Sequence, residues 1–212
     1  MAENQTHTTS GSVGESKPRI DAREKVTGAA VYTNDLQFGN ALLFARIKRS
    51  PHPHALIKKL DVSKALALPG VKAVVTGEDF PGYIGLYLQD RYIFCRDRVR
   101  YVGDPVAGVA AISEEIAQQA VNLIEVEYEV LEPVLDPEYG ASPEAPILHP
   151  NLAEYKVANF IFPQPGTNVG NHFKIRKGNV DEAWSQCAAI VEHKYKVPHI
   201  QHVPIEPHVA VA

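Results

Sequence analysis

The segment Val99–Val134 constrains the fold more than any other part of the sequence, because its hydrophobic pattern predicts a strand, a helix and another strand in succession. Residues Pro105–Ile112 are apolar without alternation, which is typical of a strand covered on both faces. Ser113 can cap a helix whose first turn is acidic, an arrangement that the helix dipole favours. From Ile124 onward, apolar residues alternate with glutamates, which indicates a half-buried strand. We therefore expect a sheet with helices packed around this unit.

Ahead of this unit, the sequence predicts short elements joined by tight connections. Ala41–Lys48 and Ala55–Leu60 have the pattern of strands, and the bend Arg49–Ala55 between them contains two prolines. Each proline bars the helical region for the residue before it, so the bend should be rigid and extended. We read the two strands as a β-hairpin with a wide connection. A short helix over Val62–Leu68 and a strand over Val71–Thr76 should follow.

Two regions lack a clear period. Met1–Pro18 is polar and rich in Ser, Thr and Gly, so we expect a disordered tail there. Phe80–Arg96 begins with several Gly and Pro residues, and we expect an irregular excursion with a short strand over Tyr92–Cys95.

Seven prolines lie between Pro133 and Pro165. This density excludes long helices and central strands alike. A structureless segment of this length is unusual inside one compact domain. We interpret residues 135–169 as an extended, proline-rich connector that crosses between two bodies.

A second body should follow the connector. Its expected elements are a strand over Gly170–Lys177, a short helix and a strand over Ala188–Val197. Asn179 and Glu182 form a capping-box pattern at the start of that helix. The sequence then ends on apolar residues without a turn, a charge or a cap, so we expect the body formed by residues 170–212 to be incomplete.

Composition narrows the class of protein. The net charge is −4 and no basic stripe occurs, which argues against a nucleic-acid partner. No apolar run approaches the roughly 18 residues that a membrane span needs, and the N-terminal residues contain neither the apolar region nor the cleavage site of a signal peptide, so we expect a cytoplasmic protein without a membrane partner. Cys95 and Cys187 lie in apolar contexts and are expected to be buried, reduced thiols. An iron–sulfur cluster normally requires four thiolates, more than this chain contains.

Histidines and an acidic residue gather near the end of the sequence: His199, His202, Glu206 and His208. The surrounding prolines exclude the helix that would place two of them on one face, so the spacing does not indicate a zinc site. In an extended chain, His202, Glu206 and His208 project to one side. Contact with a ligand and a polar interface both remain open, with the interface favoured, and a small zinc hydrolase is the weakest hypothesis.

Other chemical signatures are weak. His52 and His54 alternate on the rigid bend without a third ligand nearby, so structural histidines are favoured over a metal pair. The sequence has no G-x-S-x-G elbow, no P-loop and no G-x-G-x-x-G motif. We predict no catalytic residue and no metal-binding residue in this chain.

Five segments nevertheless carry a resemblance. They are RIDAREKVTGAAVYTNDL, RSPHPHA, LPGVKAVVTGEDF, VRYVGDPVAGVAA with YEVLEPVLD, and HVPIEPHVAVA. In this order they resemble the N-terminal part of the molybdopterin-binding large subunit of the molybdenum hydroxylases, the xanthine dehydrogenase and aldehyde oxidase family. The resemblance covers nearly the whole chain after Pro18.

The resemblance implies an α+β fold. It implies an α/β hammerhead domain with a mixed sheet and few short helices over residues 19–134, including a leading segment. The connector at 135–169 and the incomplete start of a molybdenum-cofactor-binding domain at 170–212 would follow.

The resemblance also implies a function. Family members oxidise heteroaromatic or aldehyde substrates with water as the oxygen source, and pass electrons to iron–sulfur clusters and FAD on partner chains or domains. The molybdopterin cofactor would be bound mostly outside this chain, by the remaining large subunit, so no catalytic residue is carried over and the chain alone is expected to be inactive. Gln201, His202 and Glu206 are candidate near-site residues. The alternative is a stand-alone hammerhead module for interaction or assembly.

Overall fold

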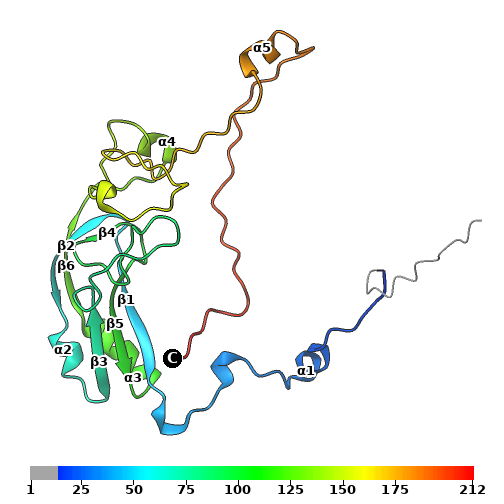
Figure 1. The fold of residues 1–212 in the computed structure, drawn as a ribbon. Coiled ribbons are helices and arrows are strands. Elements are labelled where there is room, and N and C mark those ends of the chain that lie inside the picture. Colours follow the sequence, from blue (N-terminus) through cyan, green and yellow to red (C-terminus); the bar gives the residue numbers. More distant parts are fainter. Residues whose placement is uncertain (1–13) are drawn as a thin grey trace, which may run out of the picture. The chain divides into compact units, whose positions relative to one another are not determined.

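The computed structural model describes residues 14–212 (Figure 1). They divide into two units. Unit 1 combines the described residues before Ala41 with His193–Ala212, and unit 2 spans Ala41–Glu192. Most of the predicted disordered tail, residues 1–13, lies outside the described residues. Within residues 14–212, no helix combines the length and the apolar character that crossing a bilayer requires.

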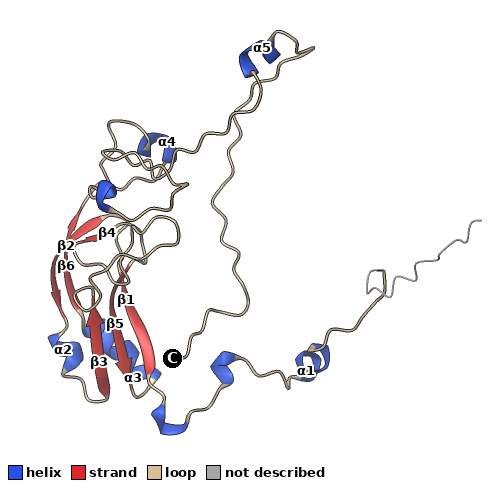
Figure 2. Ribbon diagram, in the orientation of Figure 1, coloured by secondary structure: helices blue, strands red, loops and turns tan. Residues whose placement is uncertain are grey.

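Unit 2 is built on two three-stranded sheets, in the orders β1–β5–β3 and β4–β2–β6 (Figure 2). The strands are β1 (Phe44–Arg49), β2 (Ala55–Asp61), β3 (Val71–Thr76), β4 (Arg98–Val99), β5 (Pro105–Ala111) and β6 (Glu125–Val130). All neighbouring strands in both sheets run antiparallel. The α+β class is confirmed, but the predicted mixed sheet is wrong, because the chain forms two antiparallel sheets.

Strand β5 is the centre of the first sheet, as its apolar pattern predicts. It pairs with β1 on one edge and β3 on the other, and most of its residues are buried. Helix α3 (Glu114–Leu123) follows, and the backbone N–H of Ile116 donates to Ser113 Oγ at 3.3 Å. The predicted cap at Ser113 is therefore confirmed.

The core lies on both faces of β5. Successive side chains on a strand point to opposite faces. Ala107 and Val109 accordingly join the cluster under α3 and α2 (Ser63–Leu66), whereas Val106 joins a second cluster with Cys95 and residues of the β4–β2–β6 sheet. Leu60 packs against both clusters, so the two sheets share one continuous apolar interior.

The predicted β-hairpin of the first two strands is wrong. β1 pairs with β5, and β2 pairs with β4 and β6, so the two strands belong to different sheets. The double-proline bend between them carries the chain from one sheet to the other. Ser50 N donates to Asp104 O at 2.9 Å, and Gly103 N donates to Ser50 O at 2.8 Å. Alternation indicates which face of a strand is buried, but it does not identify the pairing partner.

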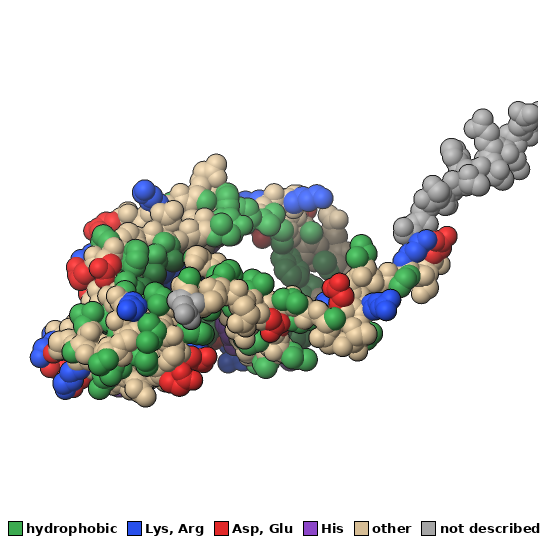
Figure 3. Space-filling view, turned by 90° about the horizontal axis from the view of Figure 1, so that it is seen from below, with side chains coloured by type: hydrophobic (Ala, Val, Ile, Leu, Met, Phe, Trp, Pro, Cys, Tyr) green, Lys and Arg blue, Asp and Glu red, His purple; other side chains and the backbone are tan. Residues whose placement is uncertain are grey.

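The half-buried character of β6 is confirmed. Its glutamates point outward and pair with lysines: Lys58 with Glu129, Lys59 with Glu127, and Lys64 with Glu125. Figure 3 shows positive and negative side chains interspersed at the left edge of the view, the side on which β2 and β6 lie in Figure 1. Val130 departs from the prediction, because its side chain is exposed.

The segment 135–169 contains more structure than an extended connector. It forms α4 (Pro137–Gly140) and a 3-10 turn over Leu152–Glu154. The Asn168 side chain holds it together: Nδ2 donates to the carbonyls of Gly140 and Pro146 at 3.0 Å each, and Oδ1 accepts from Leu148 N at 2.8 Å. The expected lack of long helices and central strands is confirmed, but the segment is folded back on itself rather than extended.

Three other predicted strands do not form in the described chain. Tyr92–Cys95 lies in an irregular loop, and Gly170–Lys177 and Ala188–Val197 have no strand assignment. An alternating sequence needs a ladder of backbone hydrogen bonds to a neighbouring strand, and none of these segments forms one within residues 14–212. Cys95 N donates to Pro105 O of β5 at 2.7 Å, but no ladder continues from it. Helix α5 (Val180–Trp184) does form, and its predicted cap is confirmed, since Glu182 N donates to Asn179 Oδ1 at 3.3 Å.

Helix α1 (Ala22–Thr27) of unit 1 was not predicted from the sequence patterns. It ends at Gly28, whose φ of 73° is left-handed. A glycine adopts this conformation without steric cost, which explains why Thr27-Gly28 terminates the segment.

Gly108 in β5 tests how tightly the core is packed. A Cβ at this position would lie 2.8 Å from Phe94 Cζ and 3.0 Å from Val75 Cγ2. We expect Gly108→Ala to lower the free energy of unfolding by about 1–3 kcal/mol, because both neighbours must shift. Gly82→Ala is the matched control, since nothing lies within 4 Å of its added Cβ. Urea denaturation of both variants measures the difference, and equal stabilities would contradict the packing described here.

Candidate functional site

Two surface cavities of unit 2 share the side chain of Cys95 in their linings. The first has a volume of about 390 Å³ and lies between β2 and the turn that follows β3. The second has a volume of about 360 Å³ and lies between the loop at 84–105 and His149. The chemistry that each cavity supports depends on the polar groups in its walls.

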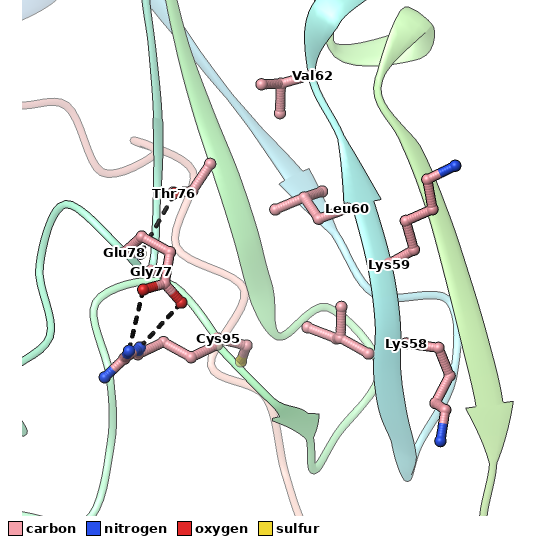
Figure 4. Close-up of a pocket in the computed structure, with 10 residues that line it drawn as sticks. Lys58, Lys59, Leu60, Val62, Thr76, Gly77, Glu78 and Cys95 are labelled. Atoms are coloured by element: carbon pink, nitrogen blue, oxygen red, sulfur yellow. Dashed lines mark hydrogen bonds and ion pairs between the residues drawn. The ribbon is translucent and has the colours of Figure 1, made fainter.

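The first cavity has one apolar wall and one wall closed by an ion pair (Figure 4). Leu60 and Val62 supply the apolar wall. Arg96 and Glu78 close the other side, with Nη2–Oε2 and Nε–Oε1 distances of 3.0 and 3.3 Å. Figure 4 shows the Lys58 and Lys59 amines on the opposite side of β2. The basic side chains near this cavity, Lys58, Lys59 and Arg96, therefore each form an ion pair with a glutamate of the chain.

The second cavity is lined by one buried polar residue, Asp104, and by half-buried ones that include Arg100 and His149. Asp104 is 8% exposed and accepts a hydrogen bond from Arg100 N at 2.9 Å. Arg100 Nε in turn donates to Leu148 O at 2.8 Å. Burial raises the pKa of the Cys95 thiol, and the nearby Asp104 carboxylate raises it further. The thiol is protonated at neutral pH and is not an activated nucleophile.

His149 completes this cavity as a neutral imidazole. Its Nδ1 lies 3.1 Å from the Tyr155 hydroxyl oxygen. Burial and the neighbouring positive charge of Arg100 lower the pKa of His149 to about 4. At neutral pH the ring is thus uncharged and hydrogen-bonded within the fold.

The predicted structural role of His54 is confirmed. The ring is 1% exposed, Nδ1 donates to Glu132 O at 2.6 Å, and Arg98 Nη1 donates to Nε2 at 3.1 Å. Both ring nitrogens are thereby used to join β2, β4 and the chain after β6. His52 packs edge-on against the Tyr128 ring, with centroids 5.0 Å apart.

The cysteine prediction is half right. Both thiols are free; Cys95 is buried as predicted, but Cys187 is exposed. Cys187 follows α5, where the chain is exposed throughout, so an apolar sequence context did not guarantee burial.

The near-site candidates Gln201, His202 and Glu206 lie in unit 1, on a segment without helix or strand. All three are exposed, and the neighbouring Val203 has a φ of 49°. The described chain does not enclose a cofactor at these positions. Within residues 14–212, no group of three or more His, Cys, Asp or Glu side chains has metal-binding geometry.

Sequence reasoning missed the polar groups that organise unit 2, namely Arg98, Arg100, His149 and Asn168. One signal was available: Asp104 sits in the Gly-Asp-Pro turn, and aspartate is favoured in turns because its side chain hydrogen-bonds nearby backbone. Arg100 gave no signal, because its hydrogen bond to Leu148 O joins residues 48 apart in the sequence. His149 gave none either, although its partner Tyr155 is only six residues away.

Comparison with known proteins identifies the class. Residues 27–132 match the family model for the aldehyde oxidase and xanthine dehydrogenase a/b hammerhead domain. Residues 161–212 match the model for a molybdopterin cofactor-binding domain. The chain thus consists of a hammerhead domain followed by residues of a molybdopterin cofactor-binding domain. It belongs to the aldehyde oxidase and xanthine dehydrogenase family of molybdenum hydroxylases, as the quoted segments predicted.

Two relatives are similar to this chain over nearly all of its length. The chain is 37% identical to a probable xanthine dehydrogenase subunit of Bacillus subtilis, over 93% of this chain and 25% of the relative. It is 34% identical to the nicotinate dehydrogenase large molybdopterin subunit of Eubacterium barkeri, over 94% of this chain and 44% of the relative. The chain therefore spans less than half of the length of each of these two relatives.

Two solved structures illustrate the structural match. Quinoline 2-oxidoreductase from Pseudomonas putida 86 is similar with a TM-score of 0.58 and 35% identity, over 64% of this chain and 18% of that protein chain. The aldehyde oxidoreductase from Desulfovibrio gigas is similar with a TM-score of 0.58 and 32% identity, over 63% of this chain and 16% of that chain.

The two thiols should differ in reactivity. In the native protein we expect Cys187 to react quickly with a thiol reagent, and Cys95 to react only after denaturation, because it is buried and its pKa is raised. Cys187→Ser should abolish the fast reaction, and Cys95→Ser should leave it unchanged. Equal rates for both thiols in the folded protein would show that Cys95 is accessible.

His149 should make stability depend on pH. The pKa of this histidine is near 6.5 in the unfolded chain and about 4 in the folded one, so between these values the unfolded chain binds more protons. Stability is full above pH 6.5 and decreases as the pH falls toward 4. The decrease should be about 2 kcal/mol, less than the whole pKa difference implies, because solvent partly screens the ring. His149→Gln should remove this component. Urea midpoints measured across the window test it, and parallel pH profiles for both proteins would contradict it.

Proposed function

We propose that this chain is the N-terminal part, or a split subunit, of the molybdopterin-binding large subunit of a molybdenum hydroxylase. The enzyme would oxidise a heteroaromatic or aldehyde substrate with water as the oxygen source. The observation that carries the proposal is the order of the two matches, hammerhead domain and then cofactor-binding domain, along one chain. The names of the matched proteins, a nicotinate dehydrogenase, a quinoline oxidoreductase and an aldehyde oxidoreductase, support these substrate classes.

The proposed role of this chain is structural. When bound, the molybdopterin cofactor supplies the redox chemistry of such enzymes, and we propose that it is held mostly outside this chain. Gln201, His202 and Glu206 are proposed to lie near the cofactor. Their exposure in the described chain supports no enclosed site, so we assign them no chemical step and assign no catalytic residue. On this proposal the chain alone is inactive.

The domain limits remain part of the proposal. We place the hammerhead domain at 19–134, the connector at 135–169 and the start of the cofactor-binding domain at 170–212. The cross-links made by Asn168 support a limit near 169, because they tie the connector to itself up to that residue.

We propose partner subunits that carry iron–sulfur clusters and FAD, with assembly in the cytoplasm. The names of two matched proteins support the existence of partner subunits. One is a subunit of a 6-hydroxypseudooxynicotine dehydrogenase complex, and the other is a large molybdopterin subunit. The two cysteines are too few to hold an iron–sulfur cluster within this chain.

Co-purification with the neighbouring gene products tests the proposal. We expect the complex to contain molybdenum by elemental analysis and to oxidise N-heterocycles or aldehydes, with ¹⁸O from labelled water entering the product. The isolated chain should do neither. A complex that forms without molybdenum, and without hydroxylase activity, would favour the stand-alone assembly module instead.

A further inference from the structure

One surface of unit 2 carries exposed apolar and aromatic side chains on two segments that are paired by their backbones. It is formed by two segments that are far apart in sequence, and we call it the aromatic edge. Its members are Leu86 (82% exposed), Tyr87 (52%), Val157 (42%), Phe160 (48%) and Phe162 (50%). Large apolar side chains gathered on one surface are typical of an interaction site, whereas single ones are common on any protein.

The aromatic edge is held in place by backbone pairing. Gln89 N donates to Lys156 O at 2.9 Å, and Ala158 N donates to Tyr87 O at 2.8 Å. The Tyr87 and Phe160 rings meet edge to face, with centroids 5.3 Å apart. The surface is therefore preorganised, which lowers the entropic cost of binding.

Gly85 sets the shape of the loop that carries this edge. An added Cβ would lie 2.0 Å from the carbonyl oxygen of Leu88, so only glycine allows the backbone to turn this closely. The tight turn projects Leu86 into solvent rather than into the core.

The surface formed by β2 and β6 is charged, in contrast to the apolar aromatic edge. There the outward side chains form lysine–glutamate pairs, such as Lys58 with Glu129 and Lys59 with Glu127. Such a surface is typical of contact with water. Aromatic residues are enriched and lysine and glutamate are depleted in protein interfaces, which favours the aromatic edge over this surface as a docking site.

The position of the aromatic edge in the chain points to its occupant. The match to the cofactor-binding domain begins at residue 161, between Phe160 and Phe162. This chain matches 25% and 44% of the length of the Bacillus subtilis and Eubacterium barkeri relatives, so the larger part of each relative lies outside the match. The matched range therefore begins within the aromatic edge, which makes the cofactor-binding part of the subunit its neighbour in the sequence.

We infer that the aromatic edge is the docking surface for the remaining cofactor-binding part of the molybdopterin-binding large subunit. The inference rests on the proposed function and adds to it the residues that make the contact. Tyr87 and Phe160, paired at the centre of the edge, are the expected anchors, because central aromatic residues contribute most to binding.

Co-expression tests the inference. The full chain, with an affinity tag, is produced together with the remaining part of the large subunit from its own genome as a separate polypeptide. We expect the unsubstituted chain to retain that polypeptide. The double variant Tyr87→Asp, Phe160→Asp should reduce the amount retained by at least about tenfold. Leu86→Asp, which removes no ring contact, should also reduce retention. Leu66→Asp is the matched control, because Leu66 is 53% exposed on α2, outside the aromatic edge.

The outcomes separate the two proposals. Circular dichroism and thermal melting verify that each variant is folded. If folded edge variants retain the polypeptide as well as Leu66→Asp does, the docking surface is wrong and the proposed function stands. If the unsubstituted chain retains nothing, or its genome encodes no such polypeptide, the proposed function fails and the inference fails with it. If the edge variants only abolish self-association of the chain, a second copy is the occupant and the inference is overturned.

Discussion

The double pairing of β5 is the constraint on which the rest of unit 2 depends. A strand with β1 on one edge, β3 on the other and apolar side chains on both faces can lie only in the interior. One face must then be covered by helices and the other by a second layer, and the two clusters on either side of β5 provide this. The close approach of Phe94 to Gly108 shows how little space the second layer leaves.

Polar side chains beside this core are used by the fold itself, in hydrogen bonds that join its strands and loops. Near the second cavity, Arg100 and Asp104 are hydrogen-bonded to the backbone, and His149 is hydrogen-bonded to the Tyr155 hydroxyl. His54 and Arg98 join strands, Arg100 holds the Leu148 carbonyl, and Asp104 accepts from a backbone N–H. A buried donor or acceptor left unpaired is costly, so these contacts stabilise loops that carry few apolar residues.

The parts of the fold that sequence could predict are those governed by neighbouring residues. Ser113 and Asn179 cap their helices, and the alternation after Ile124 identifies the buried face of β6. The pairing of β1 with β5 was not predictable, because it joins strands that are far apart in the sequence. The strand pattern of Ala188–Val197 failed for a related reason: alternation describes a surface that needs a partner, and no partner strand pairs with it in the described chain. The near-site candidates Gln201, His202 and Glu206 came from the family resemblance alone. The structure adds only that all three side chains are exposed.

Two segments that carried the resemblance meet in the structure, and this contact explains what such segments do. The bend RSPHPHA and the turn in VRYVGDPVA are joined by Ser50 and Asp104, by Gly103 and Ser50, and by Arg49 Nη1, which donates to Gly103 O at 2.9 Å. The bend leads from the first sheet to the second, and the turn leads back from β4 to β5. Two of the crossings between the sheets, β1 to β2 and β4 to β5, are therefore fastened at one point. Residues of this kind therefore hold the two sheets in position relative to each other.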